Sequence, residues 1–585
     1  MTDNYDFLYN GAGSSLEPES DVSTGYRFPM SRIGAPTSPQ TANQIQEVSS
    51  RLSEGMKMVE LQPLQPMTFE TIPKQHIEEI NRLSKLTGSE VSVHAPMIDP
   101  AGFSERGKWS ESDREEAERQ LWNVVERSHG LSPKGNIPVT IHASSIMAAE
   151  YKAGVEGEKE AIVIINQDTG DMAAARREEK YYPEFKKKQI ETPEDEIRII
   201  NRSEWNNNFH PILDIRTDAA GMMQDSVKVL LPIMDKLRKN EISEKELTVE
   251  QKSAINQLNS ANIYLDSVES RLRAMYHRAC MYGSDKDKKK LQELSGEWQK
   301  QTEIIQKGKA GFVEIPLMRA ELIDKSMDIL GSIEPPKVYK PVEDFAKEKA
   351  SQTLANISFM AYDKFKNNAP IINIENFMPG SAFSRADDLK KLIEASRSEF
   401  VKKAEKQGYS SDEAKTAAEK MIGVTWDIGH INLLRKAGFS KEKIVEETKK
   451  IAPYVKHLHM TDNFGFEDSH LPVGMGEVPV KEMMKELEKA GYSGKAIMEA
   501  GGFVAHFKTS PHPYVLEAMG SPLYSAYMQP FWGNMRGTAG AYSSGYGMML
   551  PDQHFSIYGS GFSTLPSEVG GQVHGRSRFS GAPME

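Results

Sequence analysis

The stretch IINIENF at residues 371–377 is a short apolar run that ends in polar residues, Glu375 and Asn376. A carboxylate at the end of an apolar strand must be compensated by a cation or by hydrogen-bond donors. Seven other apolar runs also end in a polar or proline-containing loop. They are SRIGAP (31–36), KMVELQP (57–63), EVSVHAP (90–96), PVTIHAS (138–144), GVTWDIGH (423–430), VKHLHMTD (455–462) and KAIMEAGG (495–502).

Amphipathic helical stretches separate these candidate strands. RADDLKKLIEASRSEFVKKAEKQG (385–408), for example, places Leu389, Leu392 and Ile393 on one face and ends at a glycine. Eight strands that alternate with helices predict an α/β fold, a (β/α)₈ TIM barrel. A doubly wound open sheet is the alternative, but it seldom needs eight units. Neither of the phosphate-binding patterns GxGxxG and GxxxxGK[ST] follows any of the strands, which argues further against the open sheet.

The regular spacing breaks once, between the fourth and fifth strands, where a long insertion is expected. KEAIVIINQDTGDMAAARRE (159–178) predicts a β-hairpin. QKSAINQLNSANIYLDSVESRLRAMYHRA (251–279) has an apolar stripe at helical spacing, as in a helical hairpin. The expected organisation is a disordered arm (1–27), the first half of the barrel (28–154), an inserted, mostly helical subdomain (155–345), the second half of the barrel (346–525) and a Gly/Ser/Tyr-rich disordered tail (526–585).

Composition limits the class of protein but leaves its partner open. The net charge of −11 argues against a broadly basic nucleic-acid surface, although bound divalent cations could supply positive charge locally. The single cysteine, Cys280, excludes an internal disulfide framework and a thiolate metal cluster. No signal peptide and no apolar run long enough to span a membrane are recognised, so we expect a cytoplasmic protein without a membrane partner. The oligomeric state is not determined by these features.

Six of the eight strands end in a side chain that can bind metal, and strand ends meet at one rim of a barrel. The six are His94, His142, Glu375, Asp427, His459 and Glu499. Three further candidates follow the strands, namely His430, Asp468 and His470. Mixed imidazole and carboxylate donors suit Zn²⁺, Mn²⁺, Fe²⁺ or Co²⁺ without selecting one of them.

These motifs resemble those of the xylose-isomerase-like TIM barrels. The resemblance covers about residues 28–150 and 350–525, and it is clearest in VSVHAP, IINIEN, WDIGHIN, HLHMTDN, DSHLPVGMGEV and IMEAGG. That superfamily includes sugar isomerases and epimerases and the endonuclease IV type of apurinic/apyrimidinic (AP) endonuclease, the AP endonuclease family 2. His457 lies two residues before His459 and faces the same side of its strand. We prefer His459 as the ligand because it fits the His-x-x-Asp pattern, which makes His457 a residue one layer down the barrel.

Resemblance to the nuclease implies three Zn²⁺ ions that activate a hydroxide against a phosphodiester at an abasic site in DNA. His94, His142 and Glu375 would then hold the first ion. Asp427, His459 and Glu499 would hold the second, with Glu375 bridging. The third ion would be held by His430, Asp468 and His470.

Resemblance to the isomerases implies one metal ion, Zn²⁺ or Mn²⁺, held by Glu375, Asp427, His459 and Glu499. Glu375 and Glu499 would then also transfer protons on a small sugar or sugar phosphate. Several local features favour this alternative. KMVELQP resembles the isomerase "VEL" pattern and has no counterpart of the nuclease's Gln-Arg signature, and DSHLPVGMGEVPVKEMMKELEKAGYSGKAIME (468–499) closely resembles the end of many sugar epimerases. Met378 to Gly380 also replaces the Gly-Gln-Gly of the nuclease. The complete ligand set nevertheless leads us to expect an endonuclease-IV-like DNA-repair hydrolase first and a sugar isomerase or epimerase second. A non-catalytic scaffold is the third hypothesis.

Overall fold

The computed structural model describes residues 32–500, apart from 54–55, 105–107, 133, 182–187, 235, 237–245 and 308–309. The predictions for the arm at 1–27 and the tail at 526–585 fall outside the described residues. The chain forms two compact units. Of the described residues, one unit contains those up to Val163 and those from Pro341 onward, and the other contains those of Ile164–Lys340. In the described part of the chain, no helix is long and apolar enough to cross a membrane.

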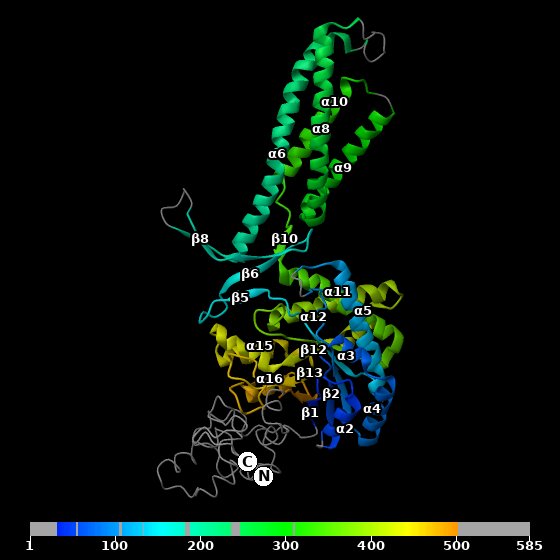
Figure 1. Cartoon of the computed structure of the whole chain (residues 1–585), viewed down its shortest axis with the longest axis vertical. Coiled ribbons are helices and arrows are strands. Elements are labelled where there is room, and N and C mark those ends of the chain that lie inside the picture. Colours follow the sequence, from blue (N-terminus) through cyan, green and yellow to red (C-terminus); the bar gives the residue numbers. More distant parts are fainter. Residues whose placement is uncertain are drawn as a thin grey trace, which may run out of the picture. The chain divides into compact units, whose positions relative to one another are not determined.

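The first unit is a closed barrel of eight parallel strands, which confirms the predicted fold (Figure 1). The barrel closes in the order β1-β14-β13-β12-β11-β4-β3-β2, so β4 and β11 are neighbours across the insertion. The strands are β1 (Ile33–Pro36), β2 (Met58–Leu61), β3 (Glu90–His94), β4 (Pro138–His142), β11 (Ile371–Glu375), β12 (Ile422–Asp427), β13 (Val455–Met460) and β14 (Ala496–Met498).

Five of the strands, β3, β4, β11, β12 and β13, carry two polar positions spaced two residues apart, which places both on the inner face of the barrel. On β12, for example, Thr425 lies one layer below Asp427, and all six residues of this strand are buried. The register pairs Thr425 with His457 and Asp427 with His459 on the adjacent strand β13. The barrel interior therefore has a lower polar layer and an upper layer that holds most of the candidate ligands.

Amphipathic helices cover the outside of the barrel (Figure 1). In α12 the predicted stripe of Leu389, Leu392 and Ile393 is buried, and the helix ends just before Gly408, whose φ is 92°. The helices of this unit are α2 (Gln44–Ser53), α3 (Pro66–Thr71), α4 (Lys74–Thr87), α5 (Glu111–Ser128), α11 (Val342–Phe365), α12 (Ala386–Lys406), α13 (Ser411–Met421), α14 (Ile428–Asn432), α15 (Lys441–Ile451) and α16 (Val480–Lys489).

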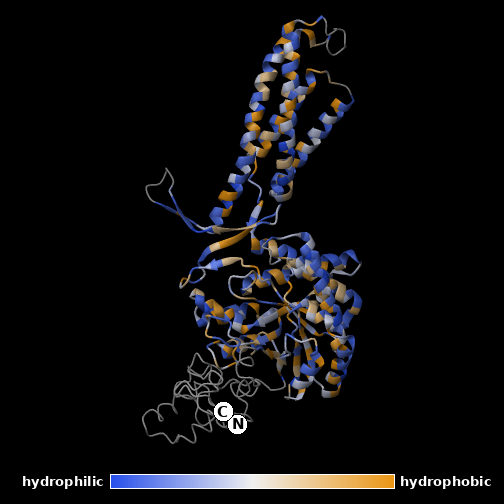
Figure 2. Ribbon diagram, viewed as in Figure 1, coloured by the Kyte–Doolittle hydropathy of each residue, from blue (hydrophilic) through white to orange (hydrophobic). Residues whose placement is uncertain are grey.

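The second unit consists mainly of four helices, α6 (Pro193–Leu230), α8 (Val249–Tyr282), α9 (Asp285–Gln306) and α10 (Glu314–Ser332). Leu258, Leu265, Val268 and Leu272 of α8 are buried in a core with apolar residues of α6 and α10. Hydrophobic and hydrophilic residues alternate along these helices (Figure 2). A mainly helical insertion after β4 is therefore confirmed. The stretch 251–279 lies within one continuous helix, and the helix it pairs with is α6.

Short strands accompany the insertion. The predicted hairpin at 159–178 is present as the pairing of β6 with β7. β8 pairs with β9, and β5 pairs antiparallel with β6. The short strands are β5 (Ala149–Tyr151), β6 (Lys159–Asn166), β7 (Met172–Arg176), β8 (Glu178–Lys180), β9 (Gln189–Glu191) and β10 (Tyr339–Pro341).

Candidate metal centre

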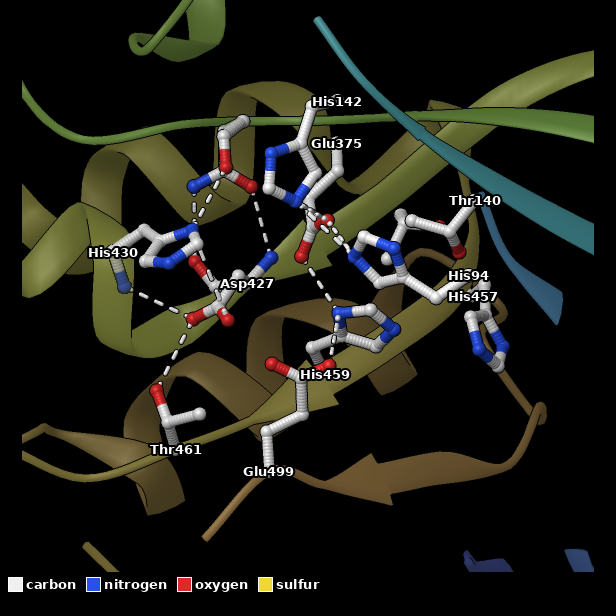
Figure 3. A network of polar contacts seen from close by, with 12 residues as sticks. His94, Thr140, His142, Glu375, Asp427, His430, His457, His459, Thr461 and Glu499 are labelled. Atoms are coloured by element: carbon white, nitrogen blue, oxygen red, sulfur yellow. Dashed lines mark hydrogen bonds and ion pairs between the residues drawn. The ribbon is translucent and has the colours of Figure 1, made fainter. Parts of the chain in front are cut away.

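The barrel brings all nine predicted ligands to the carboxyl ends of its strands or to the loops that follow them. Figure 3 shows most of them converging inside the barrel mouth. Most are buried, but the side chains of His142, Asp468 and His470 are 13%, 10% and 30% exposed and so reach solvent. Eight of the nine fall into three groups whose ligand atoms lie within 4.8 Å of one another, and Glu499 forms a further group of this kind with His94 and His459.

The first group is His94, His142 and Glu375, at the ends of β3, β4 and β11. The Nε2 atoms of the two histidines lie 3.1 Å apart, and each is 3.1 Å from Glu375 Oε2. Three lone-pair atoms thus form a nearly equilateral triangle. Ligands of a tetrahedral Zn²⁺ at 2.0–2.1 Å lie roughly 3.3 Å apart, so this triangle fits a cation with little movement.

The second group is Glu375, Asp427 and His459, with Glu499 beside it. His459 Nδ1 lies 2.6 Å from Glu375 Oε1 and 3.4 Å from Glu499 Oε1. Asp427 Oδ2 is buried and has no hydrogen-bond partner among the described residues. A buried carboxylate oxygen of this kind is costly unless a cation or a donor satisfies it. The donor set therefore fits a divalent cation.

The third group is His430, Asp468 and His470. Asp468 Oδ2 lies 3.3 Å from His430 Nε2 and 2.8 Å from His470 Nε2, whereas Asp468 Oδ1 is buried without a hydrogen-bond partner in the described chain. His470 has a φ of 44°, which is uncommon for a residue other than glycine and occurs often at functional sites. The third group is thus also compatible with a cation.

Backbone hydrogen bonds hold Asp427 and His430 in place. Asp427 Oδ1 caps the short helix α14 by accepting from the backbone N–H of Gly429 and of His430, at 2.6 and 2.9 Å. The Asn376 side chain joins β11 to β12, donating to the Asp427 carbonyl and accepting from its N–H. The Asn376 carbonyl also lies 2.9 Å from His430 Nδ1, which turns His430 Nε2 toward Asp468.

Asp462 holds the loop that carries Asp468 and His470. Its carboxylate accepts from the backbone N–H of Asn463, Gly474 and Val478, at 2.8 to 3.0 Å. Burial raises the pKa of Asp462 to about 6, against the opposing effect of these donors. The Asp of the His-x-x-Asp pattern is therefore part of the loop structure rather than a member of the three groups.

Burial and neighbouring charges shift the pKa values of the ligands in opposite directions. Burial would raise the pKa of Glu375, but His459 and His142 outweigh it and hold this pKa well below its usual range. Burial raises the pKa of Glu499 above its ordinary value, against the lowering effect of His459. For His94 and His470, burial lowers the pKa, but Glu375 and Asp468 respectively outweigh it and raise each pKa to about 9. A divalent cation competes with these protons for the same lone pairs.

Two further residues, Glu60 and Gln62, contact the predicted ligands and were not among the candidates predicted from the sequence. Gln62 Nε2 donates to Glu499 Oε1 at 3.0 Å. Glu60 lies in the lower polar layer, fully buried, and contacts both His457 and His459. Burial would raise the pKa of Glu60, but the two histidines hold it below its usual range. The signal was present in the VEL stretch, where a carboxylate stands in the middle of an apolar strand. His457 lies one layer below His459, at the place predicted for it.

Comparison with known proteins gives one family match and short matches to curated relatives. Residues 392–511 match the family model described as xylose isomerase-like TIM barrel. An uncharacterized protein of Methanocaldococcus jannaschii is 36% identical over 85 residues, which are 14% of this chain and 28% of that protein. Fructoselysine 3-epimerase of Shigella flexneri is 28% identical over 78 residues, 13% of this chain and 27% of the epimerase. The chain thus matches little more than a quarter of each relative's length.

Solved structures that match parts of this backbone include a D-tagatose 3-epimerase-like protein and a D-psicose 3-epimerase from Clostridium cellulolyticum H10. The first has a TM-score of 0.34 and 12% identity over 80% of this chain and 90% of the other. The second has a TM-score of 0.36 and 8% identity over 85% of this chain and 97% of the other. Likeness at this level says nothing about activity. Residues 392–511, which include the barrel strands β12, β13 and β14, are therefore similar to the xylose isomerase-like TIM barrels.

Proposed function

We propose that this barrel is a metal-dependent enzyme that epimerises or isomerises a small sugar. The observation that carries the proposal is the convergence of two buried carboxylates, Glu375 and Glu499, on His459 Nδ1, at 2.6 and 3.4 Å (Figure 3). Proton transfer on the carbon next to a carbonyl needs one group to remove a proton and a second to return one. The local similarity to fructoselysine 3-epimerase supports a sugar as the substrate.

In this proposal Glu375, Asp427, His459 and Glu499 hold one divalent cation, which polarises the substrate oxygens when bound. One of the two carboxylates takes the proton from the substrate carbon as the C–H bond breaks. The other delivers a proton to the opposite face of the same carbon, which inverts it, or to the neighbouring carbon, which isomerises the sugar. Gln62 orients the Glu499 carboxylate through its hydrogen bond. The acidic net charge of the chain is compatible with a neutral substrate.

Deuterium uptake from solvent tests this proposal. The protein loaded with Mn²⁺ or Zn²⁺ is incubated in D₂O with fructoselysine and a panel of ketohexoses, and products are analysed by mass spectrometry and NMR. We expect one carbon-bound deuterium in the product, and a loss of roughly 10²–10⁴-fold in rate for Glu375→Gln or Glu499→Gln. Glu447→Gln is the matched control, because Glu447 is a buried carboxylate of the same barrel that bonds to Arg385 and the Ala386 N–H. Absence of deuterium uptake with every sugar would contradict the proposal.

A second candidate function rests on the third group. A one-metal isomerase leaves His430, Asp468 and His470 without a cation, whereas a trinuclear phosphodiester hydrolase uses them. The comparisons support this endonuclease expectation less well than the sugar alternative, because the matched relatives with a stated activity are epimerases. Elemental analysis close to three metal ions per chain, with chelator-sensitive cleavage of a duplex carrying an abasic analogue, would support the hydrolase. One metal ion per chain would exclude it.

A further inference from the structure

Glu60 is a buried carboxylate in the lower layer of the barrel, and no part of the proposed reaction uses it. It stands on β2 with a relative exposure of 0%. Its Oε2 atom accepts from the Ser92 hydroxyl at 2.7 Å and lies 2.9 Å from His457 Nε2. These two contacts from neighbouring side chains hold the Oε2 atom in place. The other oxygen, Oε1, is left to point up the barrel.

The atom nearest to Glu60 Oε1 on this upper side belongs to His459. Glu60 Oε1 lies 2.9 Å from His459 Nε2 as an ion pair, and both are buried atoms without a hydrogen-bond partner in the described chain, so each is the nearest polar complement of the other. The opposite nitrogen of the ring, His459 Nδ1, faces Glu375 and Glu499. The imidazole is therefore oriented with one nitrogen toward the candidate ligands and one toward Glu60.

A neutral imidazole has one N–H and one lone pair, so a partner at one nitrogen decides the role of the other. Both ring nitrogens of His459 face carboxylates, which can only accept: Nδ1 faces Glu375 Oε1 and Nε2 faces Glu60 Oε1. When a cation takes the lone pair of Nδ1, the proton of the neutral ring lies on Nε2, and Glu60 is the acceptor beside it. Outer carboxylates of this kind orient a histidine ligand and increase its basicity, and their loss commonly costs 10- to 100-fold in metal affinity. Thr140 and Thr425, which occupy the same layer on β4 and β12, bond to each other at 2.8 Å and leave this role to Glu60.

We propose that Glu60 is a positioning residue that fixes the tautomer and the ring orientation of His459, so that Nδ1 is available to the cation. This inference rests on the metal centre of the proposed function, and it holds whichever substrate that centre serves. His457 and Ser92 act behind Glu60 by holding its other oxygen. Glu60 itself touches neither the substrate nor the cation.

Co²⁺ binding to the purified full chain tests this role without a substrate. Wild type, Glu60→Gln, Glu60→Asp and the control Glu447→Gln are stripped with chelator and titrated with Co²⁺, followed by visible absorption. His459→Ala identifies which of the bound ions depends on His459. We expect Glu60→Gln to lower the affinity for that ion by about 10- to 100-fold. Glu60→Asp should lower this affinity less, and Glu447→Gln should bind Co²⁺ as wild type does.

Wild-type Co²⁺ affinity in folded Glu60→Gln overturns the inference, as does the absence of any Co²⁺ binding by wild type. Circular dichroism and thermal unfolding establish whether each variant is folded. If Glu60→Gln does not fold, Glu60→Asp decides, and an affinity unchanged from wild type overturns the inference. The outcome is separate from that of the sugar proposal: a protein that fails to exchange deuterium with any sugar but loses Co²⁺ affinity in Glu60→Gln refutes only the proposed substrate.

Discussion

Gly429 packs so closely against Thr461 that a β-carbon on Gly429 would lie 1.7 Å from Thr461 Oγ1 and 3.0 Å from Thr461 Cβ. Gly429 is also a backbone donor to Asp427 Oδ1. The Gly429→Ala substitution must therefore displace the turn that holds Asp427 or push Thr461 away. A displacement near 1 Å can cost about 100-fold in turnover. We expect Gly429→Ala to lose about that factor in activity and to bind metal more weakly, as measured by deuterium uptake and Co²⁺ titration.

Gly221→Ala is the matched control for this change. Gly221 lies within α6, and a β-carbon there meets nothing within 4 Å. Glycine inside a helix destabilises it by about 0.5–1 kcal/mol relative to alanine. We expect Gly221→Ala to slow amide hydrogen exchange in α6 and to leave metal binding unchanged. Equal effects of the two substitutions on Co²⁺ affinity would contradict the role given to Gly429.

Asp468→Asn tests whether the third group is a separate cation site. The substitution removes the charge that His430 and His470 share, while the first two groups keep all their ligands. If the third group holds an ion in wild type, elemental analysis will show one metal ion fewer per chain in Asp468→Asn. If wild type holds one ion at Glu375, Asp427, His459 and Glu499, the count will stay the same. Loss of every ion would show that the three groups are not independent.

Asp99 makes the stability of the barrel depend on pH. It lies in the loop after β3, where it accepts from the Ser144 hydroxyl at 2.5 Å and from the Ala101 N–H at 2.8 Å. Burial raises its pKa from 3.8 to about 6, despite these donors. The folded state therefore binds more protons than the unfolded state between those values. The free energy of unfolding falls as pH rises through this window, by at most about 3 kcal/mol.

Asp99→Asn removes this titration. We expect the difference in free energy of unfolding between wild type and Asp99→Asn to change between pH 4 and pH 6 and to stay constant above pH 7, in denaturant titrations of both proteins. The sign is such that wild type loses stability relative to the variant as the pH increases. A difference that does not vary over this range would show that Asp99 has an ordinary pKa.

Leu265→Ala tests the core of the inserted unit. Leu265 of α8 is fully buried among the helices, whereas Ile263 of the same helix is 69% exposed. Truncating a buried leucine to alanine usually costs about 2–5 kcal/mol. We expect Leu265→Ala to increase amide hydrogen exchange throughout α8, with Ile263→Ala close to wild type. Similar exchange in the two variants would contradict the packing of α8.

The eight strands and their order could be read from the amino-acid sequence, because each is an apolar run of the right length that ends at a polar residue. The same runs placed six candidate ligands at one rim, since the ends of parallel barrel strands converge, and three more in the segments that follow. The limits of α6 were harder to predict. Its first half, from Pro193, is a polar stretch with no apolar stripe, and it is helical because its few apolar residues, such as Trp205 and Ile212, pack in the core of the inserted unit.

The sequence by itself determined which residue types stand at each strand end and, from a spacing of two, that His457 and His459 face the same side. Only the tertiary structure decided how those residues are grouped and which atoms face each other. Glu60 and His459 are about four hundred residues apart along the chain. Their side chains meet only because the barrel closes and places β2 and β13 around a shared interior. Local sequence patterns indicate which side chains of one strand share a face, but they carry no information about contacts that form only when the sheet closes.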